Sequence, residues 1–132
     1  NDAKKILASN KNLIVIGVTG SYGKTSTKNY LAAVLAEKYN VLATPGNFNT
    51  LLGVIRTIRE HLRPYHQVFI VEMGAKQAND IKEICDLVHP TIGIVTAVGE
   101  MHLETFKSIG NIQDTKFELI KKSAAKNITA KN

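Results

Sequence analysis

The feature that most constrains this chain is an apolar run that leads into a glycine-punctuated turn and then a helical pattern. The run occupies residues 14–18 and the turn T-G-S-Y-G-K-T occupies residues 19–25. Glycines let the backbone curl so that successive N–H groups face an anion, and the following helix directs its positive end to the same place. Lys24 would carry charge to the β- and γ-phosphates, and the Thr25 hydroxyl would bind Mg²⁺. The order predicts a loop that binds a nucleoside triphosphate.

This loop differs from the common G-x-x-x-x-G-K-[ST] pattern, because Val18 stands where the first glycine belongs. The alternative is an ordinary strand–turn–helix corner in which the glycines and the lysine bind nothing. Strand, turn, Gly-Lys-Thr and helix coincide here, and this coincidence favours the phosphate loop.

Length and composition indicate one globular domain with a hydrophobic core, since 44% of the 132 residues are hydrophobic. No apolar run approaches the roughly 20 residues that cross a bilayer, and no secretory signal is visible, so we expect no membrane span. Cys85 is the single cysteine, which excludes an internal disulfide and fits a cytoplasmic location.

The net charge of +6 lies near the two ends of the sequence. Residues 12–115 hold nine basic and nine acidic residues, whereas residues 116–132 hold five lysines against one glutamate. A nucleic-acid surface needs a clustered basic face on the fold itself. We therefore expect no nucleic-acid partner.

Apolar stretches of strand length alternate with helical patterns along the chain. Strands are predicted over residues 13–18, 41–44, 67–72 and 91–96, and helices over residues 2–9, 25–39, 50–62, 79–88 and 109–123. Strands that are apolar on both faces predict an α/β fold, a parallel sheet sandwiched by helices. No fifth strand is expected. Residues 1–12 are interpreted as a lead-in segment, residues 13–122 as the nucleotide-binding domain and residues 123–132 as a polar tail.

In such a sheet, ligands bind at the carboxyl ends of the strands. The loops concerned are residues 19–25, 44–50, 72–76 and 96–104, which hold many of the polar and ionisable residues of this chain. Glu72 ends an apolar strand, and an acid there can hold Mg²⁺ beside a phosphate loop.

Several other residues stay undecided on position alone. His102 follows the fourth strand, where it would either contact a ligand or be solvated. Asn47 and Asn49 would either form a turn and helix cap or orient a phosphate or carboxylate, with Asn49 or Thr50 as the cap. Lys116 looks like a solvated helical lysine. The other three histidines, which we interpret as structural or solvated, are His61, His66 and His89.

Taken together, these motifs resemble the central, ATP-binding domain of the Mur ligase family, the amide ligases that extend the peptide of peptidoglycan precursors. The resemblance rests on T-G-S-Y-G-K-T-S-T-K, T-P-G-N-F-N-T-L-L-G, V-E-M-G-A, T-A-V-G-E-M-H-L-E-T-F and T-K-F-E-L-I, which together span about residues 13–120. Within the family, E-M-G-A followed by H-L-E-T-F is most similar to the branch that adds D-alanyl-D-alanine to a UDP-muramoyl-tripeptide.

The resemblance implies a role for each matching residue. Glu72 and His102 match metal-binding residues, Asn47 matches an asparagine near the reacting groups, and Lys116 matches a lysine that is carbamylated in several members and helps hold a second Mg²⁺. Lys24 and Thr25 match the phosphate and Mg²⁺ contacts. The phosphate-binding loop residues that match are Gly20, Ser21, Tyr22, Gly23, Lys24, Thr25 and Ser26.

The family chemistry implied is formation of an acyl phosphate from ATP, followed by amide formation. Ala97 stands where many relatives have an asparagine. The resemblance also implies that the flanking domains for the UDP-sugar and the incoming amine are missing and that the central domain is incomplete after Lys116. We therefore expect this chain alone to bind nucleotide weakly or not at all, and to lack ligase activity. Amino-acid specificity and oligomeric state stay open.

Three alternatives remain at this point. One is another Mur-type ligase, such as a folylpolyglutamate-like enzyme that activates a different carboxylate. A small phosphate-loop kinase or ATPase would need arginines in a lid, and no arginine follows Arg63. The third is a non-catalytic fragment that keeps the fold.

Overall fold

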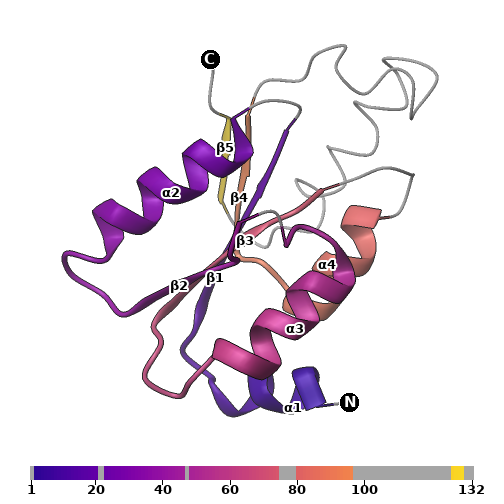
Figure 1. Cartoon of the computed structure of the whole chain (residues 1–132). Coiled ribbons are helices and arrows are strands. Elements are labelled where there is room, and N and C mark those ends of the chain that lie inside the picture. The colour runs from indigo at the N-terminus through magenta and orange to yellow at the C-terminus, as the bar shows by residue number, and fades with distance from the viewer. Residues whose placement is uncertain (1, 21–22, 47, 75–79, 97–125, 130–132) are drawn as a thin grey trace.

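The computed structural model describes residues 2–20, 23–46, 48–74, 80–96 and 126–129, which form one α/β unit (Figure 1). Its elements, in chain order, are α1 (Asp2–Ser9), β1 (Ile14–Thr19), α2 (Lys24–Leu35), β2 (Val41–Ala43), α3 (Leu51–His61), β3 (Val68–Glu72), α4 (Asp80–Val88), β4 (Ile92–Val95) and β5 (Lys126–Thr129). Both ends of each described element lie within two residues of the predicted ends, with two exceptions. These are the end of α2 and the strand β5, which was not predicted. Among the described helices, none combines the length and the apolar character that crossing a membrane requires.

The strands form a single parallel sheet in the order β2-β3-β1-β4-β5. The central strands β1 and β3 pair from Ile14 with Val68 to Val18 with Glu72. This register aligns the carboxyl end of β3 with the start of the loop that follows β1. The α/β fold with a parallel sheet between helices is thus confirmed.

Helices cover both faces of this sheet (Figure 1). Val15, Phe69 and Val71 contribute to the core shared with α1, α3 and α4. The intervening residues Ile16 and Ile70 point to the other face, where α2 packs. This alternation is the period of two that a strand imposes, and it explains why the strand sequences are apolar throughout.

Two predictions at element ends need correction. Helix α2 ends at Leu35 rather than Tyr39, because the chain then tightens into turns in which the N–H groups of Lys38 and Tyr39 both donate to the Leu35 carbonyl. The expectation of a polar tail after four strands is wrong over residues 126–129, which form β5 parallel to β4. A short strand at a sheet edge tolerates a polar sequence such as K-N-I-T.

The capping prediction at α3 is confirmed, because the Gly53 N–H donates to Thr50 Oγ1 at 3.2 Å. His66 is structural as expected, since its Nδ1 accepts from the Arg63 N–H at 2.9 Å in the turn before β3. The predicted helix over residues 109–123 and the possible cap Asn79 lie outside the described residues.

Phe69 provides a test of the core. Its side chain is fully buried in the central strand β3, so Phe69→Ala should lower the free energy of unfolding by about 3–5 kcal/mol through lost burial and a residual cavity. Urea unfolding would measure the change. Leu52→Ala, at a side chain that is 77% exposed, is the control and should change it by less than about 0.5 kcal/mol. Equal effects of the two substitutions would contradict this description of the core.

Candidate functional site

The loop between β1 and α2 is shaped by two glycines with positive φ. Gly20 has φ 146°, and a Cβ placed there would lie 1.7 Å from Thr96 Oγ1, so no side chain fits unless Thr96, directly after β4, moves. Gly23 has φ 74° and precedes the first residue of α2. No side chain among the described residues caps this helix, and its first turn holds no acidic residue. The N–H groups at the start of α2 are therefore available to an anion.

Lys24 stands at the first position of α2, beside those N–H groups. Desolvation by burial lowers the pKa of Lys24 from its ordinary 10.5, and the negative charge of Glu72 opposes this shift in part. Burial therefore removes more hydration from the ammonium than the charge of Glu72 offsets. A phosphate group at the start of α2 would add negative charge beside it.

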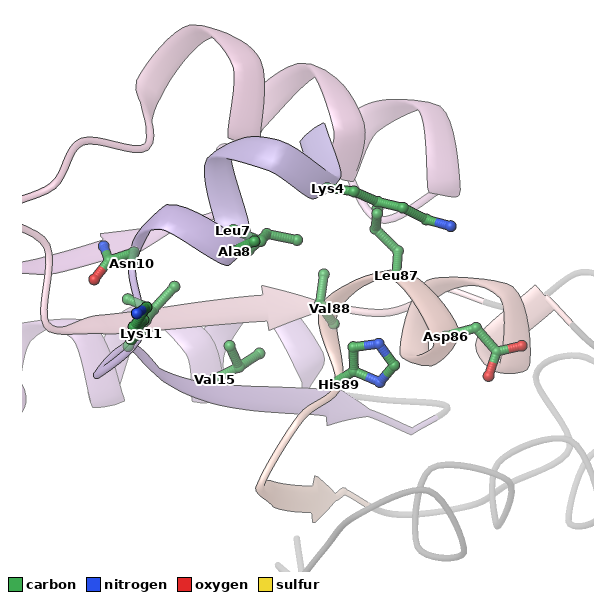
Figure 2. Close-up of a pocket in the computed structure, with 11 residues that line it drawn as sticks. Lys4, Leu7, Ala8, Asn10, Lys11, Val15, Asp86, Leu87, Val88 and His89 are labelled. Carbon is green, nitrogen blue, oxygen red and sulfur yellow. The ribbon is translucent and has the colours of Figure 1, made fainter. Parts of the chain in front are cut away.

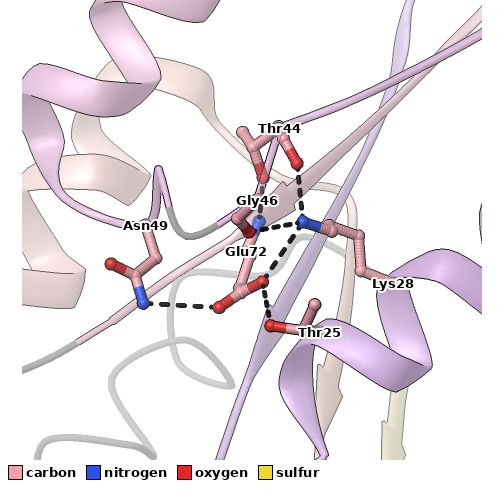
Figure 3. Close-up of polar contacts among 6 residues, drawn as sticks. All are labelled: Thr25, Lys28, Thr44, Gly46, Asn49 and Glu72. Atoms are coloured by element: carbon pink, nitrogen blue, oxygen red, sulfur yellow. Dashed lines mark hydrogen bonds and ion pairs between the residues drawn. The ribbon is translucent and has the colours of Figure 1, made fainter.

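Glu72 ends β3, and its carboxylate joins segments from three parts of the chain (Figure 3). The Thr25 hydroxyl lies 3.0 Å from Oε1, and the Asn49 amide nitrogen donates to Oε2 at 3.3 Å. The backbone N–H of Glu72 donates to Thr44 Oγ1 at 3.1 Å. The prediction that the loops after β1, β2 and β3 meet at the carboxyl edge of the sheet is confirmed for these described residues.

A further residue of this site, Lys28, was not assigned a role from the sequence. Its side chain, in the second turn of α2, is only 2% exposed, and Nζ lies 3.3 Å from Glu72 Oε1. The ammonium also donates to the carbonyl oxygens of Thr44 and Gly46, at 2.6 and 2.9 Å. A signal was present, because Lys28 precedes Leu31, Ala32 and Leu35 at the spacing i, i+3, i+4 and i+7 of the sheet-facing stripe of α2.

Asn49 is positioned more firmly than a turn residue requires. Its backbone carbonyl accepts from the Gly74 N–H at 2.7 Å, and a Cβ at Gly74 would lie 2.7 Å from the Asn49 side chain. Asn49 therefore sits between Gly74 and the Glu72 carboxylate. Thr50 supplies the helix cap, and the Asn49 side chain instead contacts Glu72. Orientation of a phosphate or a substrate carboxylate by Asn49 stays a prediction.

The oxygen atoms of Thr25 and Glu72 fit a magnesium ion. Mg²⁺ prefers oxygen ligands in an octahedron at about 2.1 Å, so two neighbouring ligands lie roughly 3 Å apart. The two oxygens Thr25 Oγ1 and Glu72 Oε1 are 3.0 Å apart, joined by a hydrogen bond, and this spacing also lets both bind one Mg²⁺. Within the described part of the chain, no group of three or more His, Cys, Asp or Glu side chains forms a metal cluster. Thr25 and Glu72 would therefore need further ligands, such as phosphate oxygens and water.

Five of the predicted site residues lie outside the described residues, and their predicted roles are not tested by the structure. They are Ser21, Tyr22, Asn47, His102 and Lys116. Gly20, Gly23, Lys24, Thr25, Ser26 and Glu72 are described, and all of them lie at the carboxyl edge of the sheet or at the start of α2.

A separate hollow of about 510 Å³ lies at the other end of β1 (Figure 2). It is an open hollow bordered by α1, the first residues of β1 and the end of α4. Its lining is a mixture of apolar side chains and the polar side chains of Lys4, Asn10, Lys11, Asp86 and His89. Lys4, Lys11 and His89 are exposed, which is typical of solvated surface residues. The grouping of buried charges is found at the carboxyl edge instead.

A parallel sheet with an open helix terminus, a lysine and an acid at its carboxyl edge defines a phosphate-loop nucleotide-binding domain. Residues 18–132 match the Mur ligase middle domain, and the chain therefore belongs to the Mur ligase family.

Individual relatives agree with this assignment. The chain is 43% identical over 106 residues to the UDP-N-acetylmuramoyl-tripeptide–D-alanyl-D-alanine ligase of Synechocystis, covering 80% of this chain and 23% of that protein. For the enzyme of the same name from Mycobacterium tuberculosis, identity is 44% over 107 residues, covering 81% and 21%. The chain thus spans less than a quarter of the length of these relatives.

Solved structures give the same result. The chain is similar to MurF from Acinetobacter baumannii, with a TM-score of 0.91 and 32% identity, covering 96% of this chain and 28% of that one. It is also similar to the MurF ligase from Thermotoga maritima in complex with ADP, with a TM-score of 0.87 and 37% identity, covering 96% and 30%. The family resemblance read from the motifs is confirmed.

The desolvation of Lys24 leads to a prediction about stability. Without nucleotide or divalent metal, Lys24→Met should be more stable than the wild type at pH 7, because it removes an undercompensated charge. The lowered pKa means that the unfolded chain binds more protons than the folded chain between that pKa and 10.5. Wild-type stability should therefore rise with pH in this window, and the advantage of the variant should shrink.

Denaturant unfolding at a series of pH values between 7 and 10.5 would measure this difference. Lys38→Met, at an exposed lysine beyond the end of α2, is the control for loss of a positive charge. A Lys24→Met variant that is less stable than the wild type at pH 7 would contradict the prediction.

Proposed function

We propose that this chain is the ATP-binding part of an ATP-dependent amide ligase of peptidoglycan precursor synthesis. The observation that carries the proposal is the approach of the Thr25 hydroxyl to the Glu72 carboxylate at 3.0 Å, beside Lys24 on the family's phosphate loop. The finer assignment is addition of D-alanyl-D-alanine to UDP-N-acetylmuramoyl-tripeptide. The names of the relatives and the motifs E-M-G-A and H-L-E-T-F support it.

In the proposed reaction, a substrate carboxylate oxygen attacks the γ-phosphorus of ATP, and ADP leaves. The amine of the second substrate then attacks the acyl carbon of the resulting acyl phosphate. Phosphate leaves, the amine loses a proton, and an amide remains. Phosphoryl transfer of this kind depends on positioning and charge neutralisation rather than on a protein nucleophile.

The residues of this chain supply both requirements. The ammonium of Lys24 and the N–H groups at the start of α2 would neutralise and orient the phosphates. Thr25 and Glu72 would hold Mg²⁺, which when bound neutralises phosphate charge and orients the γ-phosphate. The network around Glu72 keeps both residues in place before any ligand arrives.

Further roles are proposed from the motif match. His102 would join Glu72 in binding metal, Asn47 would lie near the reacting groups, and Lys116, if carbamylated, would help hold a second Mg²⁺. We also propose a cytoplasmic location. Because the relatives are more than four times as long as the matched segment, we propose that other parts of the full-length protein bind the UDP-sugar and the incoming dipeptide.

Lys24→Ala tests the assignment of the loop. In the full-length protein supplied with UDP-N-acetylmuramoyl-tripeptide and D-alanyl-D-alanine, we expect the rate of ADP release to fall about 100-fold or more, because the main cation at the phosphates is lost. Lys38→Met is the control and should keep the wild-type rate. If Lys24→Ala keeps full activity, the loop assignment fails. Turnover only with a different carboxylate, such as a folate, would overturn the finer assignment.

Glu72→Gln tests the metal site separately. The amide keeps the size of the side chain but removes its charge, so the Mg²⁺ concentration needed for half-maximal nucleotide binding should rise at least about tenfold. Calorimetric titration of ADP at a series of Mg²⁺ concentrations would measure it. Glu60→Gln, at an exposed acid on α3, should leave the requirement unchanged. An unchanged requirement in Glu72→Gln would remove Glu72 from the metal site.

A further inference from the structure

The ammonium of Lys28 is enclosed by acceptors from two other segments of the chain. Its side chain and that of Glu72 are 2% and 3% exposed, so both charges are almost removed from water. Nζ meets the carbonyl oxygens of Thr44 and Gly46 and the carboxylate oxygen Oε1 of Glu72. An ammonium has three N–H donors, and these three acceptors match them in number.

The same contacts fix the carboxylate of Glu72 from both of its oxygens. Oε1 lies between Lys28 Nζ and the Thr25 hydroxyl, and Oε2 accepts from Asn49 (Figure 3). Without Lys28, the buried carboxylate would lose the ammonium that contacts it, and a buried charge that has lost its partner tends to turn toward water. That rotation would carry Oε1 away from the Thr25 hydroxyl.

From this geometry we propose that Lys28 is a positioning residue for the metal–nucleotide site, which acts through Glu72. It holds the carboxylate beside the Thr25 hydroxyl, and it ties the turn at Thr44 and Gly46 to α2. The inference rests on the proposed function, because it concerns the site at which Mg²⁺ and nucleotide would bind. It goes further in assigning a role to a residue that contacts neither ligand itself.

Electrostatics alone would give the opposite effect. A cation 3.3 Å from a carboxylate repels an arriving divalent cation, so on that ground alone loss of Lys28 should strengthen metal binding. The positioning role requires that loss of Lys28 weaken metal binding. The sign of the change therefore decides between the two.

The test uses the full-length protein with ADP and Mg²⁺ as probes. ADP affinity is measured by calorimetry with and without Mg²⁺, and the ratio of the two affinities is the readout. Lys28→Met, which keeps the length of the side chain without its charge, should lower this ratio at least about tenfold. A purely structural role would lower both affinities together and leave the ratio unchanged. The matched control is Lys38→Met, which should keep the wild-type ratio.

A double substitution tests whether Lys28 acts through Glu72. Lys28→Met in the Glu72→Gln background should cause no further fall in the ratio, because the group to be positioned is already gone. This double variant contains no unpaired charge from the pair, so it remains informative if Lys28→Met alone does not fold. For Lys28→Ala, n-propylammonium added to the solution should restore the ratio at least in part.

Failure of the inference can be separated from failure of the proposed function. If ADP binding by the wild-type protein does not depend on Mg²⁺, both the proposed function and the inference about Lys28 are overturned. If the wild type depends on Mg²⁺ and Lys28→Met keeps or raises the ratio, the positioning role alone is overturned. A further fall caused by Lys28→Met in the Glu72→Gln background also overturns it.

Discussion

The burial of one carboxylate is the interaction on which the arrangement of this site depends. Glu72 is 3% exposed, and a charge so far removed from water requires compensation by a cation and by hydrogen bonds. Its partners come from α2 and from the segment after β2, and its own backbone N–H bonds to Thr44. The need to satisfy one side chain thus brings three segments of the chain together at the carboxyl edge of the sheet.

The two lysines of the site differ in how their charges are compensated. Lys28 has a carboxylate and two carbonyl oxygens around its ammonium. At Lys24, desolvation by burial lowers the pKa of the ammonium, and the charge of Glu72 opposes this shift only in part. Lys24 is therefore the less compensated of the two, which is the difference expected if Lys24 contacts a bound anion and Lys28 contacts only the protein.

Much of this arrangement could be predicted from the sequence, and the features that could not are Lys28 and β5. Strands that are apolar on both faces and alternate with helices indicate a covered parallel sheet, and the rule for strand ends then places Thr25 and Glu72 together. The role of Lys28 was not predicted, because a helical lysine is usually solvated. Its spacing with Leu31 and Leu35 nevertheless places it on the sheet-facing stripe. The strand β5 was not predicted, because its sequence is polar. Its pairing with β4 is a contact between segments far apart in the sequence, which the local sequence pattern does not indicate.

The alternation of side chains along β3 gives the buried ion pair a second consequence, for folding. Val68 and Ile70 face α2, whereas Phe69, Val71 and Met73 face α3 and α4, so Glu72 faces α2 and meets Lys28. A shift of this strand by one residue against β1 would move Glu72 into the apolar cluster on the opposite face, away from every cation of α2. The pair therefore helps to fix the register of β3, because a sheet with β3 misaligned would bury the Glu72 charge without a cation.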